Sequence, residues 1–429
     1  MVRRVQNTAI MKLLPLVALE LCVTTTLLLG QTAPPQQPTS RVEEILLERS
    51  EKQKASRPDE TERTAERVEA AFVRAQDIGE MLTASRSGLR LKMSSTAPGW
   101  DGLVLGSGFS LGTEYYRPDL TGGEMAFRAS AVGTTKSNYL FDTQLTFPRL
   151  LRDRMIVDTL ARYKAERSID YYGSGPDSER GARTNYARET SEIDIKMELR
   201  PARHAEFGVV GSSLWYNVGP GTRPGVASTE QRFRESSAPG VQDQTNFWRG
   251  GAYARFDSRT RPYLSGRGTQ FQVRFDRYDD RERALYSFGV LELDAEHAFA
   301  FLNEKRVLAL RANTALSYSG SDNIVPFYLQ QTLGGPNDLR GFRLFRFTDN
   351  NSLLLNSEYR WEVAPPLEFA IFADAGKVFT RRAQLNFDDL EASAGFGVRI
   401  KTRSAVALRL DTAFSHEGFQ LWFRFSDIF

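Results

Sequence analysis

The residues best suited to catalysis are few and scattered in this sequence. Its three histidines, His204, His297 and His416, have a spacing that matches neither a metal-ligand set nor a catalytic dyad. No Gly-x-Ser-x-Gly elbow accompanies them, and His297 has no serine partner by motif. The one cysteine, Cys22, lies in a segment that we expect to be removed, so the mature chain should hold no thiol, no disulfide and no sulfur-ligated metal. We therefore expect no catalytic residue, no metal, no cofactor and no enzymatic activity.

Composition and charge exclude two further classes of protein. The chain is 41% hydrophobic and 11% aromatic, which excludes a disordered protein. The 56 Lys and Arg residues are interleaved with 53 Asp and Glu residues and form no basic stripe, so we expect no nucleic-acid partner. Beyond the N-terminus no apolar run approaches the roughly 20 residues of a membrane-spanning helix.

The first 33 residues have the order of a secretory signal peptide. Two arginines and Lys12 precede an apolar stretch over residues 13–29, and small and polar residues follow as far as Ala33. Translation from Met11 would leave the same pattern. A membrane anchor is the alternative, but the stretch is short for a span and contains Glu20. Export predicts the periplasm, the cell exterior or the outer membrane of a double-membrane bacterium.

A short helical segment follows the expected signal peptide. Residues 34–87 are interpreted as a periplasmic linker and an amphipathic helix. One apolar face recurs at three- and four-residue steps, formed by Val68, Phe72, Ala75, Ile78 and Leu82. Two placements remain open, since the helix could dock on the rim of a barrel or act as a plug inside its lumen.

From residue 88 to residue 429 the helical period gives way to alternation. In the stretch 270–276, Phe271, Val273 and Phe275 share one face while the charged and amide side chains share the other. Alternation is typical of a soluble sandwich as well as of a membrane barrel, so export and strand number decide between them. The fold class we predict is all-β, a transmembrane antiparallel β-barrel of about sixteen strands, with one face suited to lipid and the other to water.

Short turns and long loops are expected to alternate along the barrel. The turns, assigned to the periplasmic side, are near residues 148–153, 201–204, 260–266, 301–305, 364–366 and 401–404. The loops, assigned to the cell exterior, include residues 167–183, 219–245, 320–350 and 380–391. Because side chains do not fill a sixteen-stranded lumen, the loop 320–350 is the expected insert.

The C-terminal stretch is typical of a closing strand. Phe419, Leu421, Phe423 and Phe425 share one face, and the chain ends on the aromatic Phe429. Alternating aromatic strands of this kind end many outer-membrane barrels and are recognised by strand pairing. We interpret Phe423, Phe425 and Phe429 as such a C-terminal strand signal.

Three stretches of the barrel carry a family resemblance. In the long loop, Leu-Gly-Gly at 333–335 is followed by Leu-Arg-Gly-Phe at 339–342, and downstream Phe-Ala-Asp-Ala-Gly at 372–376 follows the run Glu-Tyr-Arg at 358–360. These resemble the Arg-Gly-Phe/Tyr motif in the sixth extracellular loop, and the Phe-x-Asp-x-Gly pattern on the thirteenth strand, of the BamA/TamA outer-membrane assembly family, also called the bacterial surface antigen family. Its members generally also carry periplasmic POTRA domains, for which this chain has too few residues before its barrel.

The resemblance implies a latch between loop and barrel wall. Asp374 shares the lumen face of its strand with Phe372 and Gly376, and Glu358 takes the lumen face of the strand before. A loop folded inward could present Arg340 to both carboxylates, and a bidentate pair in a partly desolvated lumen fixes geometry. Gly341 would let the loop tip turn without a side-chain clash. With Phe342 and Gly376, these residues are the predicted loop latch.

Two functions remain open. The first is a component of outer-membrane biogenesis that inserts or translocates protein or lipid through a weak seam between the first and last strands. Its expected partners are outer-membrane lipid and periplasmic or outer-membrane assembly proteins. The alternative is a passive porin-like channel, for which a charged lumen suffices.

Overall fold

The computed structural model describes residues 87–94, 103, 106, 108–260, 266–364, 367–401 and 406–425. All of them belong to one compact unit, Ala65–Phe429. The expected signal peptide over 1–33 with Cys22, nearly all of the linker and helix expected over 34–87, and Phe429 lie outside the described residues. No helix among the described residues is long and apolar enough to cross a membrane.

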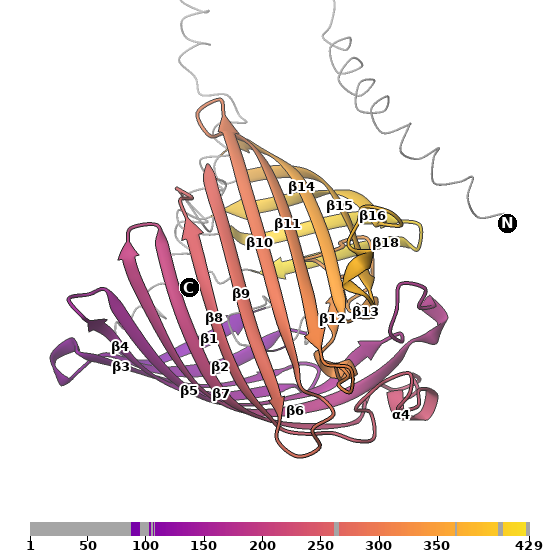
Figure 1. The fold of residues 1–429 in the computed structure, drawn as a ribbon. Helices are drawn as coiled ribbons and strands as arrows, with labels where there is room; N and C mark the ends of the chain where they lie inside the picture. Colours follow the sequence, from indigo (N-terminus) through magenta and orange to yellow (C-terminus); the bar gives the residue numbers. More distant parts are fainter. Residues whose placement is uncertain are drawn as a thin grey trace, which may run out of the picture. The chain divides into compact units, whose positions relative to one another are not determined.

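The described residues form one antiparallel sheet of 16 strands, in which every strand pairs with its neighbours in chain order (Figure 1). The strands are β1 (Gly88–Ser94), β2 (Ser110–Leu120), β3 (Met125–Thr134), β4 (Tyr139–Leu150), β5 (Met155–Tyr171), β6 (Thr184–Ala202), β7 (Ala205–Pro220), β8 (Phe247–Asp257), β9 (Gly268–Asp280), β10 (Phe288–Phe301), β11 (Arg306–Ser319), β14 (Asn351–Ala364), β15 (Leu367–Phe379), β16 (Glu391–Lys401), β17 (Val406–Ser415) and β18 (Gly418–Phe425). The all-β class and the strand number are thereby confirmed.

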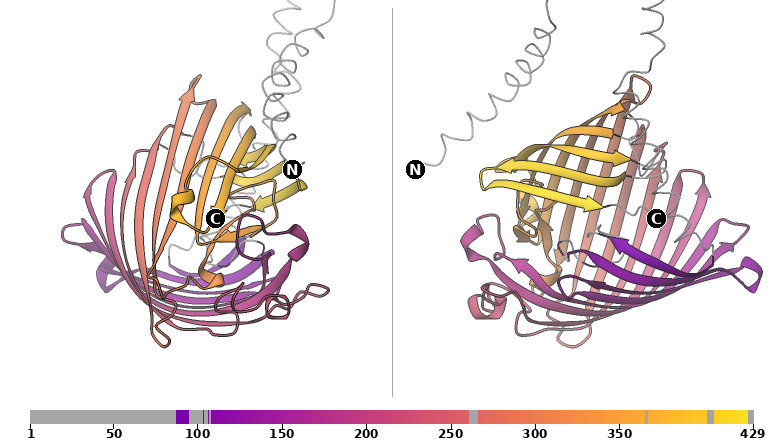
Figure 2. Two further views of the ribbon diagram at one scale, coloured as in Figure 1. Left: turned by 45° about the vertical axis from the view of Figure 1, so that its right-hand side comes forward. Right: turned by 180° about the vertical axis from the view of Figure 1, so that it is seen from behind.

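The sheet curves around on itself, with the indigo β1 and the yellow β18 at its two ends (Figure 2). Within the described residues no ladder of hydrogen bonds joins β1 to β18. The strand order thus agrees with a barrel-like sheet that is open between β1 and β18 in the described residues.

Alternation along each strand separates two faces with different environments. In β15, Phe369 and Ile371 are exposed on the outer face, whereas Phe372 and Asp374 are buried on the inner face. Large apolar side chains are exposed on the outer face of most other strands as well, including Ile193, Phe271 and Phe396. Such a surface would be costly in water, because soluble proteins seldom expose apolar patches of this extent.

The long connections lie at one end of the sheet, as the sequence predicts, although the connections 135–138 and 416–417 at that end are short. The long-loop end carries the segments 172–183, 221–246, 320–350 and 380–390. These contain η2 (Arg180–Ala182), α4 (Thr229–Arg232), η3 (Phe327–Leu329), the strand pair β12 (Gln331–Leu333) and β13 (Phe347–Asp349), and η4 (Arg382–Gln384). At the short-turn end, η1 (Thr121–Gly123) joins β2 to β3.

The loops themselves build a hydrophobic core at the long-loop end. Aromatic side chains from two loops pack on the ends of the neighbouring strands, with Phe327 contacting both Tyr171 and Tyr186 at ring centroid distances of 5.1 and 4.8 Å. Phe247 and Phe288 complete this layer, and both are fully buried. This core holds the first half of the 320–350 loop in place, so the second half begins from a fixed point.

Candidate functional site

The second half of the loop 320–350 packs against the inner face of β14 and β15. Leu339 and Phe342 have no exposed surface, and they form a core with Leu354 of β14 and Val378 of β15. Burying side chains of this size stabilises the inward position by about 1.5–3 kcal/mol each. These contacts with β14 and β15 fix the loop against the inner face of the sheet.

Arg340 projects from this loop into a pair of carboxylates. Its Nε and Nη2 donate to the two oxygens of Asp374 at 2.8 and 2.6 Å, and its Nη1 donates to Glu358 at 2.6 Å. The backbone N–H of Arg340 also donates to Asp374, at 3.2 Å. The guanidinium lies over the ring of Phe372, 3.4 Å from the ring centroid. Fork-to-carboxylate pairing fixes both distance and orientation, which a lysine could not do.

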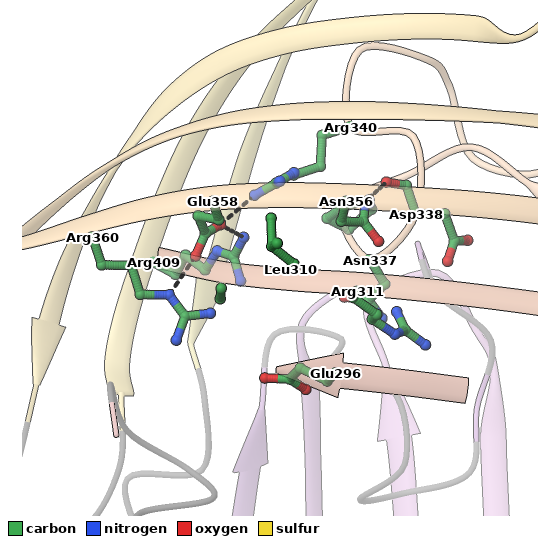
Figure 3. A pocket seen from close by; sticks show the side chains of 12 residues that line it. Glu296, Leu310, Arg311, Asn337, Asp338, Arg340, Asn356, Glu358, Arg360 and Arg409 are labelled. Carbon is green, nitrogen blue, oxygen red and sulfur yellow. Dashed lines mark hydrogen bonds and ion pairs between the residues drawn. The ribbon is translucent and has the colours of Figure 1, made fainter. Parts of the chain in front are cut away.

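Glu358 is the centre of a larger charge network. Besides Arg340, its carboxylate contacts Arg360 at 2.6 Å, Arg399 at 2.5 Å and Arg409 at 3.4 Å. Figure 3 shows Arg340, Arg360 and Arg409 converging on it from the loop, β14 and β17. Removing the carboxylate would leave the four guanidinium groups repelling one another.

The backbone of the loop tip is tied to the last two strands. Trp422 of β18 donates its indole N–H to the carbonyl of Arg340 at 2.6 Å. Ser415 of β17 donates its hydroxyl to the carbonyl of Gly341 at 2.8 Å. Arg424 of β18 also donates to the side chain of Asn337. The tip is therefore bonded to the C-terminal end of the sheet as well as to β14 and β15.

Gly341 and Gly376 both lie where the backbone is crowded. A Cβ on Gly341 would come within 2.5 Å of the Ser393 Cβ and 2.9 Å of the Phe414 carbonyl oxygen. A Cβ on Gly376 would come within 2.7 Å of the Leu353 carbonyl oxygen. Glycine at 341 permits the close approach that places Arg340 between its carboxylates.

Phe342 fills the space next to the loop tip. Its ring contacts Phe347 at 5.1 Å and His416 at 5.4 Å between centroids, both in edge-to-face geometry. His416 in turn lies 3.2 Å from the carboxylate of Glu391. The third residue of the Arg-Gly-Phe motif thus acts as a packing residue beside the ion pairs.

A cavity of about 410 Å³ opens beneath the loop tip. Polar and charged side chains dominate its lining, including Arg311, Asp338, Asn356 and Arg360 (Figure 3). Within the described residues no group of three His, Cys, Asp or Glu side chains is placed to hold a metal ion. The lining is suited to water and ions in transit.

Two loop residues of the cavity have shifted pKa values. Burial disfavours the charged guanidinium, but its bonds to Asp374 and Glu358 outweigh this and raise the pKa of Arg340 above its usual range. Burial, opposed by the charge of Arg311 and assisted by that of Asp374, raises the pKa of Asp338 to about 7. Arg340 is therefore cationic at any physiological pH, whereas Asp338 can titrate.

The structure brings together Arg340, Gly341, Phe342, Glu358, Asp374 and Gly376, which the sequence singled out. It places Phe423 exposed on β18 and Phe425 within the same strand, away from this cluster. Sequence reasoning missed Trp422, Ser415, Arg399 and Arg409. Alternation places the arginines on inner faces, but only the strand register brings them to Glu358.

Comparison with known proteins identifies the family of this fold. The family model of the Omp85 superfamily domain matches residues 72–426. The chain belongs to the Omp85 superfamily. The resemblance to BamA/TamA-type barrels is confirmed, and this Omp85 protein is an outer-membrane protein of a double-membrane bacterium. No curated protein sequence matches it.

Two solved structures are similar to this Omp85 chain in fold. A BamA from Haemophilus ducreyi lacking POTRA domains 1–3 has a TM-score of 0.59 and 15% identity, over 79% of this chain and 70% of that one. CdiB from Escherichia coli has a TM-score of 0.50 and 12% identity, over 79% of this chain and 62% of that one. The curved sheet is thus an Omp85 sheet.

Proposed function

We propose that the sheet closes into a transmembrane barrel that inserts or translocates protein or lipid at the outer membrane. The apolar outer face supports the membrane-spanning part of this proposal, because lipid is the solvent that suits it. The inner face carries the charged residues and the cavity, as a polar lumen requires. The loop 320–350 then occupies the lumen and has to move before protein or lipid can pass.

The observation that carries the proposal is the buried pairing of Arg340 with Asp374 and Glu358. We propose that this pairing is a latch. Breaking a buried pair on one side costs about 3–5 kcal/mol, because a desolvated charge loses its partner. Replacing Arg340 should therefore shift the loop strongly from the docked to the released state.

The latch would also connect the loop to the seam of the barrel. Trp422 and Ser415 bond the loop tip to β18 and β17, and β18 is the strand that must meet β1 for closure. Release of Arg340 would therefore loosen the last strand, where a client strand or a lipid could enter. Release of Arg340 would thus both free the loop from the lumen and open the seam between β18 and β1.

The test is reconstitution of the purified mature chain into phospholipid vesicles. A small unfolded outer-membrane barrel is added, and its folding into the vesicles is followed by gel mobility. We expect faster folding than in empty vesicles, and faster folding still with Arg340→Gln, because loss of the latch opens the seam to the client. Arg277→Gln is the matched control, because Arg277 is half exposed and pairs only locally with Asp279. Equal folding rates with and without the chain would reject the assembly role.

A passive channel is the second candidate function. It is favoured by the polar cavity of about 410 Å³ beneath the loop tip, which could conduct ions without any client. A passive channel would show steady conductance and no effect on the folding of added barrels. The vesicle folding assay and single-channel recording in planar bilayers therefore separate the two functions.

A further inference from the structure

The outer face of β2–β6 contains a floor of small side chains. Strand register puts Tyr115, Ala129, Thr143, Ala161 and Ile193 in one row across five neighbouring strands. The three central residues of that row are small, and the two flanking residues are large. Elsewhere on the outer face large apolar side chains are exposed, so this row forms a depression in the apolar surface.

A groove of about 590 Å³ occupies this depression. Leu89, Phe141 and Tyr163 contribute to its walls, and Thr113 and Ala131 to the floor. The exposed surface of its lining is mainly apolar, so in water it would be an unfavourable void, and in a bilayer it must be filled by something apolar. The chain is an outer-membrane protein, so this outer face meets lipid.

Aromatic contacts lead from the groove toward the long-loop end. Tyr163 of the groove wall contacts Tyr139, with 6.2 Å between ring centroids. The guanidinium of Arg167 lies 5.3 Å from the Tyr139 ring centroid and donates a hydrogen bond to its hydroxyl. Arg167 also pairs with Glu189 at 3.2 Å. Tyr139 and Arg167 thus lie next to the groove wall, on its long-loop side.

A basic cluster lies directly beyond Arg167. Asp170 is paired with two arginines, Arg183 at 2.9 Å and Arg223 at 2.6 Å. The segment that carries Arg223 is bonded to Arg167 through the backbone N–H of Thr222, at 3.0 Å. Arg183 and Arg223 are both partly exposed.

Lys136 brings a further positive charge to this region. Its ammonium group donates to the carbonyl of Gly106 at 2.6 Å, and burial together with the charges of Arg223 and Arg183 lowers the pKa of Lys136. Four cations, Lys136, Arg167, Arg183 and Arg223, therefore face the two carboxylates of Asp170 and Glu189. The surplus positive charge suits an anion.

The spacing of groove and cluster matches one membrane leaflet. Arg167 follows Ala161 by six residues on β5, about 20 Å along an extended strand. With the tilt of about 40° usual in such barrels, this is roughly 15 Å along the membrane normal. Half of the hydrocarbon thickness is about 15 Å. The floor of the groove therefore lies near the bilayer centre when the cluster lies at headgroup level.

We propose that this face binds a phosphate-bearing lipid of the outer membrane, with an acyl chain in the groove and the phosphate against the basic cluster. The groove provides the apolar area, and the arginines provide charge-assisted hydrogen bonds to phosphate oxygens. The site lies on the outer face, on strands that do not contact Arg340. It depends on the membrane location of the chain and is independent of the assembly role.

The test uses the purified full chain in detergent and two probes, lipid A and the same lipid with its phosphates removed. Native mass spectrometry measures the fraction of the chain that carries each lipid. We expect about tenfold tighter binding of the phosphorylated probe, the difference that one charge-assisted hydrogen bond of roughly 1.5 kcal/mol produces. Equal binding of the two probes would overturn the proposal.

Two variants and a control locate the binding. Ala161→Phe fills the groove and should weaken binding of both probes, whereas Ala312→Phe places the same ring on the outer face of β11 and should change neither. Replacing Arg183 and Arg223 together by Gln should remove the preference for phosphate and leave binding of the neutral probe. If Ala161→Phe matched Ala312→Phe, or instead dispersed a dimer of the chain, the groove would not be a lipid site.

Discussion

At the scale of single residues, Arg340 makes the bonds that hold the loop against the sheet. Its guanidinium meets two carboxylates on two different strands, and its backbone carbonyl meets a third strand. Each of these bonds would add little stability in water, but Arg340, Glu358 and Asp374 are all buried. Desolvation makes an intact set stable and a broken set costly.

The first prediction concerns the coupling between Arg340 and Asp374. Arg340→Gln should lower the free energy of unfolding by about 3–5 kcal/mol, because it leaves the buried Asp374 without its cation. Asp374→Asn should lower it by less, because Arg340 keeps its pairing with Glu358. The double variant should lose clearly less than the sum of the two. Urea titration in lipid vesicles measures the free energy of unfolding of the unchanged chain, the two single variants and the double variant. Additive losses would show that the two side chains act independently.

The second prediction concerns Gly341. Gly341→Ala should destabilise the docked loop by about 1–3 kcal/mol, because the new Cβ meets the Ser393 Cβ and a carbonyl oxygen. Cleavage of the loop 320–350 by an added protease reports its release. Gly181→Ala is the control, since a Cβ there meets nothing within 4 Å. Equal protease resistance of both variants would mean that the loop tip tolerates the extra carbon.

The sequence was sufficient for some of these residues and insufficient for others. Arg340, Glu358 and Asp374 were predicted because a family motif and the two-residue period together place them on facing surfaces. Trp422 was missed, since an indole on the inner face of the last strand carries no local sign of its partner. That partner is 82 residues earlier in the chain.

At the scale of elements, the loop 320–350 is held at two points. Its first half joins the aromatic core of the long-loop end, and its second half packs on β14 and β15. The pattern of turns and loops was predictable, because alternation stops wherever a strand ends. The aromatic core was not predictable, because Tyr171, Phe247 and Phe327 are brought together only by the curvature of the sheet.

The third prediction is a pH dependence of loop docking. Burial raises the pKa of Asp338 to about 7 in the docked loop, and the carboxyl would titrate near 4 in a released loop. The docked state therefore binds the proton more tightly, so docking should weaken as pH rises from about 4 through 7. Protease cleavage of the loop should be slower at about pH 5.5, where Asp338 is mostly protonated in the docked loop, than at about pH 8, where it is mostly ionised.

Asp338→Asn is the matched control for this dependence. The amide is nearly isosteric and does not titrate, so the difference in cleavage between the two pH values should shrink. A pH dependence that is unchanged in Asp338→Asn would assign it to another group.

At the scale of the whole molecule, the described sheet has the strand number and order of an Omp85 barrel. Its exposed apolar face and charged inner face follow directly from alternation, and both were predictable. Closure between β1 and β18, which the sequence also predicts, stays a prediction, because it depends on the sum of small twists and tilts over sixteen strands and no β1–β18 ladder is present in the described residues. The sequence also left the loop's bonds to β17 and β18 unpredicted, since they exist only once the sheet has curved.

In the function that we propose, the Arg340 pairing holds the loop inside a gated barrel. The most direct test is single-channel recording of the purified mature chain in planar bilayers, with Arg340→Gln and with the charge exchange of Arg340→Asp and Asp374→Arg. We predict a mostly closed chain, frequent openings in Arg340→Gln, and partial return to the closed state in the exchange variant. Large steady openings of the same size in all three proteins would contradict the claim and identify a passive channel.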